Sequence, residues 1–296
     1  VALPIHHSVN FAYEDVDEWF EVAVGKRPGH IYSRNTNPTV RPLELTMRAL
    51  DDAEECISFS TGMAAISNTL FTLLAPGDRV VAIKDTYGGT NKIFLEFLPR
   101  NNVEVALCDT LDFEEIEAEI RKGCKVLYLE TPTNPVLKVV DIERLARVAH
   151  EHRGIVIVDN TFATPVNQRP LELGADLVVY SATKYLNGHS DALGGILSGA
   201  KELVDRVFHY REINGAALHA NSAYMILRGL KTLELRIQRH NESAQKIAEF
   251  LHDHDRVEAV YYPGLPDHPN HGIARRQMDG FGGMLSFALP GDFDQV

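Results

Sequence analysis

The sequence predicts an α/β fold in which a mostly parallel central sheet is covered by helices on both faces. Between residues 55 and 200, apolar runs of strand length alternate with longer amphipathic stretches, as in consecutive βαβ units. The runs are nearly continuous in Val, Ile and Leu, whereas strands with one solvated face would alternate with polar residues. The predicted strands are residues 79–84, 103–107, 125–129, 155–158, 177–180 and 195–198.

The spacing of apolar residues places helices between and after these strands. The predicted helices are residues 43–50, 64–74, 113–120 and 142–150. A longer helical pattern, residues 221–252, is expected to leave the sheet domain and to kink near Arg228 and Gly229. After it, residues 257–261 and 283–288 are predicted to be strands on either side of a Pro/Gly-rich loop.

The chain is expected to have three parts. Residues 1–40 have little core of their own and are predicted to be an extended N-terminal arm that packs on another subunit. Residues 41–230 are predicted to form a large α/β domain. Residues 231–296 are predicted to begin a smaller α/β domain that is incomplete at residue 296.

Composition and charge disfavour several kinds of partner and site. The net charge of -12 argues against nucleic acids and anionic membranes as partners. No stretch has the roughly 18 apolar residues of a membrane span, and the first residues do not resemble a signal peptide, so a cytoplasmic protein is expected. The three cysteines are far apart, and the histidines lack accompanying ligand clusters, so neither disulfides nor a metal site is predicted.

Two charged residues are predicted to end neighbouring strands. Asp159 follows the run at residues 155–158, and Lys184 is predicted to end the buried strand that begins at residue 177. Ligands of open α/β sheets bind beyond the carboxyl ends of strands, so the acid and the amine are expected side by side at one pocket. Pyridoxal phosphate (PLP) needs this pair: its aldehyde condenses with a lysine amine, and a carboxylate keeps its pyridine nitrogen protonated. The alternative, a buried ion pair, is a weak stabilising device.

A phosphate site is predicted where a short apolar run gives way to a helix. Residues 60–65 read Ser-Thr-Gly-Met-Ala-Ala, so the backbone N–H groups of Gly62 and Met63 would point toward an anion. An ordinary Ser/Thr helix cap explains this motif equally well on its own. Ser181 and Thr183 favour the phosphate, because their hydroxyl groups precede Lys184 at alternate positions. Tyr32 and Arg34 add a phenol and a guanidinium for which the sequence suggests no local partner.

Two further residues are predicted at strand ends. Tyr87 begins Tyr-Gly-Gly-Thr after the strand at residues 79–84, where its ring could stack on the pyridine. A half-buried tyrosine in a turn is the structural alternative. Asn134, within Glu-Thr-Pro-Thr-Asn-Pro, could donate to the ring hydroxyl or to a substrate carboxylate.

A second spacing suggests a different enzyme class. Tyr180 and Lys184 are four residues apart, which is also the spacing of the catalytic pair in short-chain dehydrogenases. That chemistry needs the pair on a helix and a Gly-x-Gly-x-x-Gly turn near the N-terminus, and the sequence has no such turn. A PLP-binding scaffold without catalytic activity is the other alternative.

Six segments, in order, resemble the Cys/Met-metabolism enzymes of PLP fold type I. This family includes cystathionine γ-lyase, cystathionine γ-synthase, methionine γ-lyase and the O-acylhomoserine sulfhydrylases. The segments are Tyr-Ser-Arg-x-x-Asn-Pro-Thr (32–39), Ser-Thr-Gly-Met-Ala-Ala (60–65), Asp-x-Tyr-Gly-Gly-Thr (85–90), Glu-Thr-Pro-Thr-Asn-Pro (130–135), Val-Asp-Asn-Thr-Phe (158–162) and Ser-Ala-Thr-Lys-Tyr (181–185).

The resemblance implies a role for each candidate residue. Lys184 would carry the cofactor and shuttle protons, Asp159 would pair with the pyridinium nitrogen, and Tyr87 would stack on the ring and act as an acid. Asn134 would contact the O3′ side of the ring or the substrate carboxylate. The residues implied to hold the phosphate are Gly62, Met63, Ser181 and Thr183, joined by Tyr32 and Arg34 from a neighbouring subunit. The family's catalytic dimers pair into homotetramers.

Within the family, the sequence is most similar to cystathionine γ-lyase and γ-synthase. The segments that carry this similarity are residues 187–191, 227–233 and 262–269. Gly89 stands where methionine γ-lyases tend to have a cysteine, which argues against that activity. The expected reaction is γ-elimination or γ-replacement on a sulfur amino acid, with O-acylhomoserine sulfhydrylase and methionine γ-lyase as alternatives. The family's arginine for the substrate carboxylate is expected beyond residue 296.

Overall fold

The structure, a computed structural model, describes residues 3–291. By the density of its internal contacts the chain divides into two compact units, each made of two separate stretches of sequence. Unit 1 comprises Val1–Thr72 and Val179–Lys231, and unit 2 comprises Leu73–Val178 and Thr232–Val296. The predicted three-part organisation stays a prediction.

Unit 2 contains four parallel strands in the order β5-β4-β2-β3. The strands are β2 (Arg79–Ile83), β3 (Glu104–Cys108), β4 (Val126–Glu130) and β5 (Ile155–Asp159). All five residues of β4 are buried, as its unbroken apolar run predicts for a strand covered on both faces. In the register of β4 with β5, Glu130 lies opposite Asp159. Two carboxyl groups therefore end neighbouring strands.

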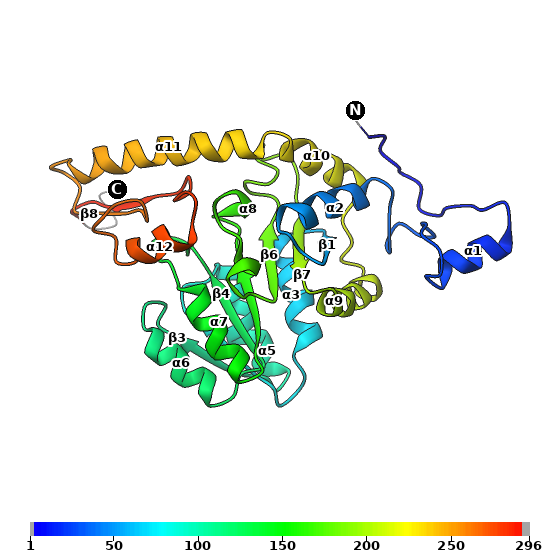
Figure 1. Cartoon of the computed structure of the whole chain (residues 1–296), viewed down its shortest axis with the longest axis horizontal. Helices are drawn as coiled ribbons and strands as arrows, with labels where there is room; N and C mark the ends of the chain where they lie inside the picture. The colour runs from blue at the N-terminus through cyan, green and yellow to red at the C-terminus, as the bar shows by residue number, and fades with distance from the viewer. Residues whose placement is uncertain (1–2, 292–296) are drawn as a thin grey trace. The chain divides into compact units, whose positions relative to one another are not determined.

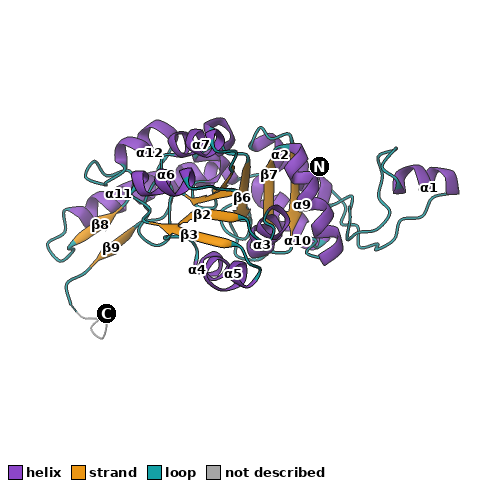
Figure 2. Ribbon diagram, turned by 90° about the horizontal axis from the view of Figure 1, so that it is seen from below, coloured by secondary structure: helices purple, strands orange, loops and turns teal. Residues whose placement is uncertain are grey.

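Helices cover both faces of these strands. Figure 2 shows α6 (Phe113–Arg121) and α7 (Ile142–Glu151) on one face, and α4 (Gly88–Lys92) and α5 (Leu98–Arg100) on the other. A π-helical turn, η1 (Ile93–Phe97), joins α4 to α5. Asp112 and Asp141 cap α6 and α7, because each side chain accepts a hydrogen bond from a backbone N–H of the first turn. The predicted α/β fold with a mostly parallel sheet is confirmed.

The remaining elements of unit 2 lie after β5 in its first stretch of sequence, or in its second stretch, which begins at Thr232. They are α8 (Thr164–Asn167), the 3-10 helix η2 (Pro170–Leu173), α11 (Leu233–His252), β8 (Ala259–Tyr261), α12 (His271–Gln277) and β9 (Ser286–Ala288). Strands β8 and β9 pair antiparallel, and α11 packs on α8 and β8. No helix within residues 3–291 has the length and apolar character needed to cross a bilayer.

Unit 1 holds the antiparallel pair of β1 and β7, with β6 next in the order. Its elements are α1 (Val16–Ala23), α2 (Val40–Leu50), β1 (Glu55–Phe59), α3 (Gly62–Leu73), β7 (Gly195–Gly199), α9 (Lys201–Asn214) and α10 (Ala220–Leu230). The division between the units falls inside β6 (Leu177–Ser181). In Figure 1, α2 lies along α10, and both α2 and α9 pack on β1.

Several helices differ from the sequence-based prediction, among them α1, α9, α10 and α11. Helix α1 interrupts the arm that was expected to be extended, and Asp15 caps it. Helix α9 was not predicted, because its buried face includes Arg211 and so lacks an uninterrupted apolar stripe. The long pattern at residues 221–252 is two helices that break at Lys231 and Thr232 rather than one helix kinked at Gly229. Gly229 instead permits close packing, since a Cβ there would lie 2.1 Å from the backbone oxygen of Asn187.

Candidate functional site

The start of α3 has the features of an anion site. β1 ends at Phe59, and Thr61 caps the helix, because its Oγ1 accepts a 3.0 Å hydrogen bond from the Ala64 N–H. The first N–H groups of a helix have no acceptor within the helix, and the helix dipole makes this end positive. The backbone N–H groups of Gly62 and Met63 therefore lie where the sequence predicts donors to a phosphate.

Gly62 touches the end of β6. A Cβ at Gly62 would lie 2.7 Å from the Cβ of Ser181 and 2.9 Å from its Cα, so no side chain fits between the helix and the strand. The Ser181 side chain consequently stands against the first turn of α3. The structure thus brings together two of the predicted phosphate residues, which are 119 positions apart in sequence.

Thr183 has a different setting. Its Oγ1 accepts a 3.2 Å hydrogen bond from the Gly194 N–H and lies 3.5 Å from the Gly194 oxygen. The hydroxyl is thereby tied to the segment that leads into β7. Its predicted role at the phosphate stays a prediction.

Lys184 is an exposed residue in a turn, which corrects the expectation that it ends a buried strand. β6 ends at Ser181, and the Lys184 N–H donates to the Ser181 oxygen at 3.2 Å. The Gly188 N–H in turn donates to the Lys184 oxygen at 2.8 Å, so the chain coils into turns as soon as the strand stops. The side chain is exposed. A buried ion pair therefore does not explain this lysine, and its amine is accessible to a reactant.

Tyr32 and Arg34 have local partners that the sequence did not suggest. The Arg34 guanidinium carbon lies 4.9 Å from the centre of the Tyr32 ring, a cation–π contact. Arg34 Nε also donates a 2.8 Å hydrogen bond to the backbone oxygen of Glu212 in α9. The pair is held as a unit, and the Arg34 side chain remains exposed.

Asp159 is a buried acid at the end of β5 and is only 6% exposed. Its Oδ1 accepts hydrogen bonds from the N–H of Thr161 at 3.0 Å and from its Oγ1 at 2.6 Å. The Tyr128 hydroxyl donates to Oδ2 across 3.5 Å. Burial raises the pKa of Asp159, and among residues 3–291 no lysine, arginine or histidine forms an ion pair with it. A cationic N–H group from a ligand would relieve this unfavourable burial.

Glu130 is a second buried acid, which the sequence analysis did not single out. It is 7% exposed and lies opposite Asp159 in the sheet. Burial, reinforced by the charge of Asp159, raises the pKa of Glu130 to about 8. The signal was present in the sequence, since both acids directly follow apolar runs whose carboxyl ends lie at one sheet edge.

Tyr87 and Asn134 both meet Glu130 through their backbones. The Tyr87 N–H donates to Glu130 Oε2 at 2.7 Å, and the Asn134 N–H also hydrogen bonds to this carboxyl group. Tyr87 precedes α4 with its side chain 50% exposed, and Asn134 is exposed as well. Both side chains are thus accessible at the end of the parallel strands.

Tyr180 does not have the setting of a dehydrogenase tyrosine. It lies on β6 rather than on a helix, and it is buried. Its hydroxyl donates a hydrogen bond to Asp51 Oδ1. The residue supports the packing of β6, and the Tyr180/Lys184 interpretation is wrong.

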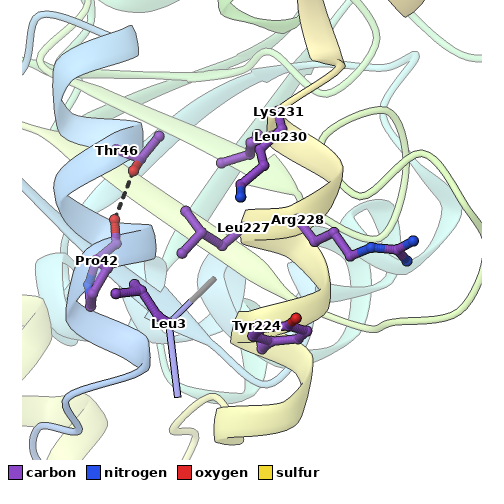
Figure 3. A pocket seen from close by; sticks show the side chains of 8 residues that line it. All are labelled: Leu3, Pro42, Thr46, Tyr224, Leu227, Arg228, Leu230 and Lys231. Carbon is purple, nitrogen blue, oxygen red and sulfur yellow. Dashed lines mark hydrogen bonds between the residues drawn. The ribbon is translucent and has the colours of Figure 1, made fainter. Parts of the chain in front are cut away.

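A pocket of 430 Å³ opens between α2 and α10 in unit 1, and none of the predicted site residues lines it (Figure 3). Leu3 and Leu227 lie at its centre, and Thr46 Oγ1 bonds to the Pro42 oxygen on the α2 side. This pocket is separate from the residues discussed above.

Each unit, taken by itself, carries groups of the kind that bind a part of PLP. Unit 1 supplies a helix start for a phosphate and an accessible amine for an aldehyde. Unit 2 supplies a buried acid that needs a cation, and an exposed aromatic ring. A phosphate, an aldehyde, a protonatable ring nitrogen and a flat ring face occur together in PLP.

Comparison with known proteins identifies a single family of enzymes. A family model described as Cys/Met metabolism PLP-dependent enzyme matches residues 1–296. An L-methionine gamma-lyase of Fusobacterium nucleatum subsp. polymorphum is 44% identical over 297 residues, 99% of this chain and 75% of that protein. A cystathionine gamma-lyase of Bacillus subtilis is 42% identical over 283 residues, 95% of this chain and 74% of that protein. The crystal structure of cystathionine gamma synthase from Xanthomonas oryzae pv. oryzae with aminoacrylate and cysteine has a TM-score of 0.93 at 36% identity, covering 99% of this chain and 74% of that one.

Proposed function

Because the chain belongs to the Cys/Met metabolism PLP-dependent enzymes, we propose that it catalyses γ-elimination or γ-replacement on a sulfur amino acid of the cystathionine type. The family, the fold type and the PLP dependence predicted from the six motifs are confirmed. The single observation that best supports the proposal is Asp159, a buried and hydrogen-bonded acid without a cationic partner among the described residues. A protonated pyridine nitrogen is the partner it fits.

The proposed roles follow from the setting of each residue. When bound, PLP supplies an electron sink for negative charge that develops on the substrate. Lys184 Nζ binds the cofactor aldehyde and afterwards moves protons at the substrate Cα and Cβ. Asp159 holds the proton on the ring nitrogen, and Tyr87 covers the ring and donates a proton to the leaving group. Asn134 orients the O3′ side of the ring or the substrate carboxylate.

The phosphate is proposed to bind at the first turn of α3. The N–H groups of Gly62 and Met63 donate to it, and the hydroxyl groups of Ser181 and Thr183 complete the site. The contact between Gly62 and Ser181 supports two of these four assignments.

Methionine and O-acylhomoserine are the alternative substrates to cystathionine within the family. Gly89 argued against methionine, yet a relative named L-methionine gamma-lyase is 44% identical, as similar as the relative named cystathionine gamma-lyase at 42%. Both eliminations use the proton transfers proposed for Lys184. Comparing kcat/KM for L-cystathionine, L-methionine, and an O-acylhomoserine with cysteine decides the substrate.

The decisive test of the cofactor site is reduction with borohydride followed by peptide mass spectrometry. The wild-type protein with PLP should carry the reduced cofactor on residue 184. Lys184→Ala should carry none and should not turn over substrate. Lys201→Ala, a control that changes an exposed lysine of α9 paired with Asp205, should behave like the wild type. Normal activity of Lys184→Ala would contradict the proposal.

We also propose a cytoplasmic homotetramer built from two catalytic dimers, in which Tyr32 and Arg34 reach the phosphate bound by a partner subunit. The free, buried state of all three cysteines is consistent with a reducing compartment. Sedimentation measures the assembly directly. Mixing inactive Lys184→Ala and Arg34→Ala proteins should restore part of the activity, because a mixed dimer contains one site with both residues intact. No recovery in exchanged dimers would contradict shared sites.

A further inference from the structure

We infer that Glu130 is a positioning residue whose buried carboxyl group fixes the backbones of Tyr87 and Asn134, the two residues of unit 2 that reach the cofactor ring and the substrate. This inference rests on the proposed function. It adds a role for a residue that does not itself contact the cofactor.

The geometry places Glu130 at the junction of two segments. It is the last residue of β4, and its Oε2 accepts the Tyr87 N–H at 2.7 Å from the turn that begins α4. The Asn134 N–H, from the loop after β4, also hydrogen bonds to this carboxyl group. One side chain therefore joins the loops that follow β2 and β4.

Tyr87 and Asn134 need such an anchor because packing does not hold their side chains. The Tyr87 side chain is 50% exposed, and Asn134 is exposed. An exposed ring can be placed reproducibly only if its backbone is fixed, and a displacement of about 1 Å at an active site can cost about a hundredfold in rate. The buried acceptor supplies this fixed point.

The position is an unfavourable one for an acid, which favours a functional reason for its presence. Glu130 faces Asp159 on β5, and the charge of Asp85 also disfavours its ionisation. The Lys138 amine forms its ion pair with Asp85, at 2.8 Å. Burial is the main cause of the raised pKa of Glu130. A carboxyl group accepts hydrogen bonds from N–H groups in both protonation states. The proposed role therefore depends on the length of the Glu130 side chain rather than on its charge.

Three substitutions of Glu130 distinguish the effect of side-chain length from the effect of charge. Glu130→Gln keeps the length of the side chain and an acceptor oxygen but removes the charge. Glu130→Asp keeps the charge but shortens the side chain by one methylene, and Glu130→Ala removes the acceptor. Glu151→Ala, an exposed acid at the end of α7, serves as the control.

The first readouts are the dissociation constant for PLP, the circular dichroism of the bound cofactor, and kcat and KM measured separately. We expect Glu130→Gln and the control to stay within about twofold of the wild type. Glu130→Asp and Glu130→Ala should bind PLP about tenfold more weakly, because two hydrogen bonds to a buried acceptor are lost or stretched. Their cofactor dichroism should change, and kcat should fall more than KM rises.

A further readout does not depend on the cofactor. Amide hydrogen exchange at Tyr87 and Asn134 in cofactor-free protein should be slow in the wild type and in Glu130→Gln, and fast in Glu130→Asp. This measurement decides the inference even if the wild type binds no PLP, an outcome that would instead refute the proposed function. If Glu130→Ala does not fold, the Glu130→Gln and Glu130→Asp variants still decide whether Glu130 positions the two backbones. A normal Glu130→Asp protein, or a Glu130→Gln protein as defective as Glu130→Asp, would overturn the inference.

Discussion

The contact between Gly62 and Ser181 makes Gly62→Ala a sharp test of the phosphate site. The added methyl carbon would lie 2.7 Å and 2.9 Å from two carbons of Ser181, whereas carbon atoms in contact are about 3.5 Å apart or more. A shift of roughly 0.8 Å is therefore needed to relieve the closer contact. Neither partner can rotate away, because one clashing atom is the Cα of Ser181 at the end of β6. We expect the first turn of α3 to move.

The shift has two measurable consequences. Overpacking of this kind costs about 1–3 kcal/mol in the free energy of unfolding. The same shift takes hydrogen bonds of about 2.9 Å to beyond 3.5 Å, which is outside bonding range. Because hydrogen bonds to a charged group contribute about 1.5–3 kcal/mol each, PLP and inorganic phosphate should bind at least about tenfold more weakly.

Urea unfolding and a titration with each ligand measure both effects. Gly272→Ala is the matched control, since Gly272 also lies in the first turn of a helix and a Cβ there meets nothing within 4 Å. That substitution should be neutral or stabilise the protein by about 0.5 kcal/mol. A Gly62→Ala protein with unchanged stability and unchanged affinity for PLP would refute the assignment of the phosphate to α3.

The remaining predictions concern buried charges. The folded-state pKa of Glu130 is about 8 and lies above the value of 4.5 for the unfolded chain. Between these values the folded chain holds a proton that the unfolded chain has lost, so the free energy of unfolding should fall as pH rises from about 5 to about 8. Urea unfolding across this range should show a smaller fall for Glu130→Gln. Asp159→Asn should raise the melting temperature of cofactor-free protein, because it removes a buried acid, while it lowers kcat; calorimetry and a rate assay test the two effects. Arg211→Ala should cost about 1.5–3 kcal/mol in urea unfolding, because it removes the buried cation 3.3 Å from Glu44 and leaves Arg41, at 3.4 Å, as the ion-pair partner of that carboxyl group. Adding Glu44→Gln should recover part of that loss.

Strand positions, and the positions of candidate residues at strand and helix ends, could be predicted where the signal is local. Each predicted strand of the parallel sheet lies within one residue of an observed strand, because strands buried on both faces produce unbroken apolar runs. Asp159 was correctly placed at a strand end for the same reason. The helix start at Gly62 followed from the Ser-Thr-Gly sequence before an apolar stretch.

Other features depend on contacts that a local pattern does not contain. The settings of Glu130 and Arg211 follow from sheet register and from partners far away in sequence, respectively. Lys184 could not be recognised as exposed, since it closely follows the apolar run at residues 177–180 and only the turn after Ser181 removes it from the strand. Gly229 suggested a kink, whereas its function is to admit the backbone of Asn187.

The pairing of β1 with β7 also determines when, during synthesis of the chain, β1 can form its hydrogen bonds. β1 ends at Phe59, but its hydrogen-bonded neighbour begins only at Gly195, so a ribosome adding about 5–20 residues per second leaves this strand without a neighbour for on the order of ten seconds. A nascent chain stalled after residue 178 should be cut by proteases near β1, and one stalled well beyond residue 231 should resist. Until β7 is synthesised, the unpaired β1 strand is the segment of the nascent chain that would bind a chaperone or begin to aggregate.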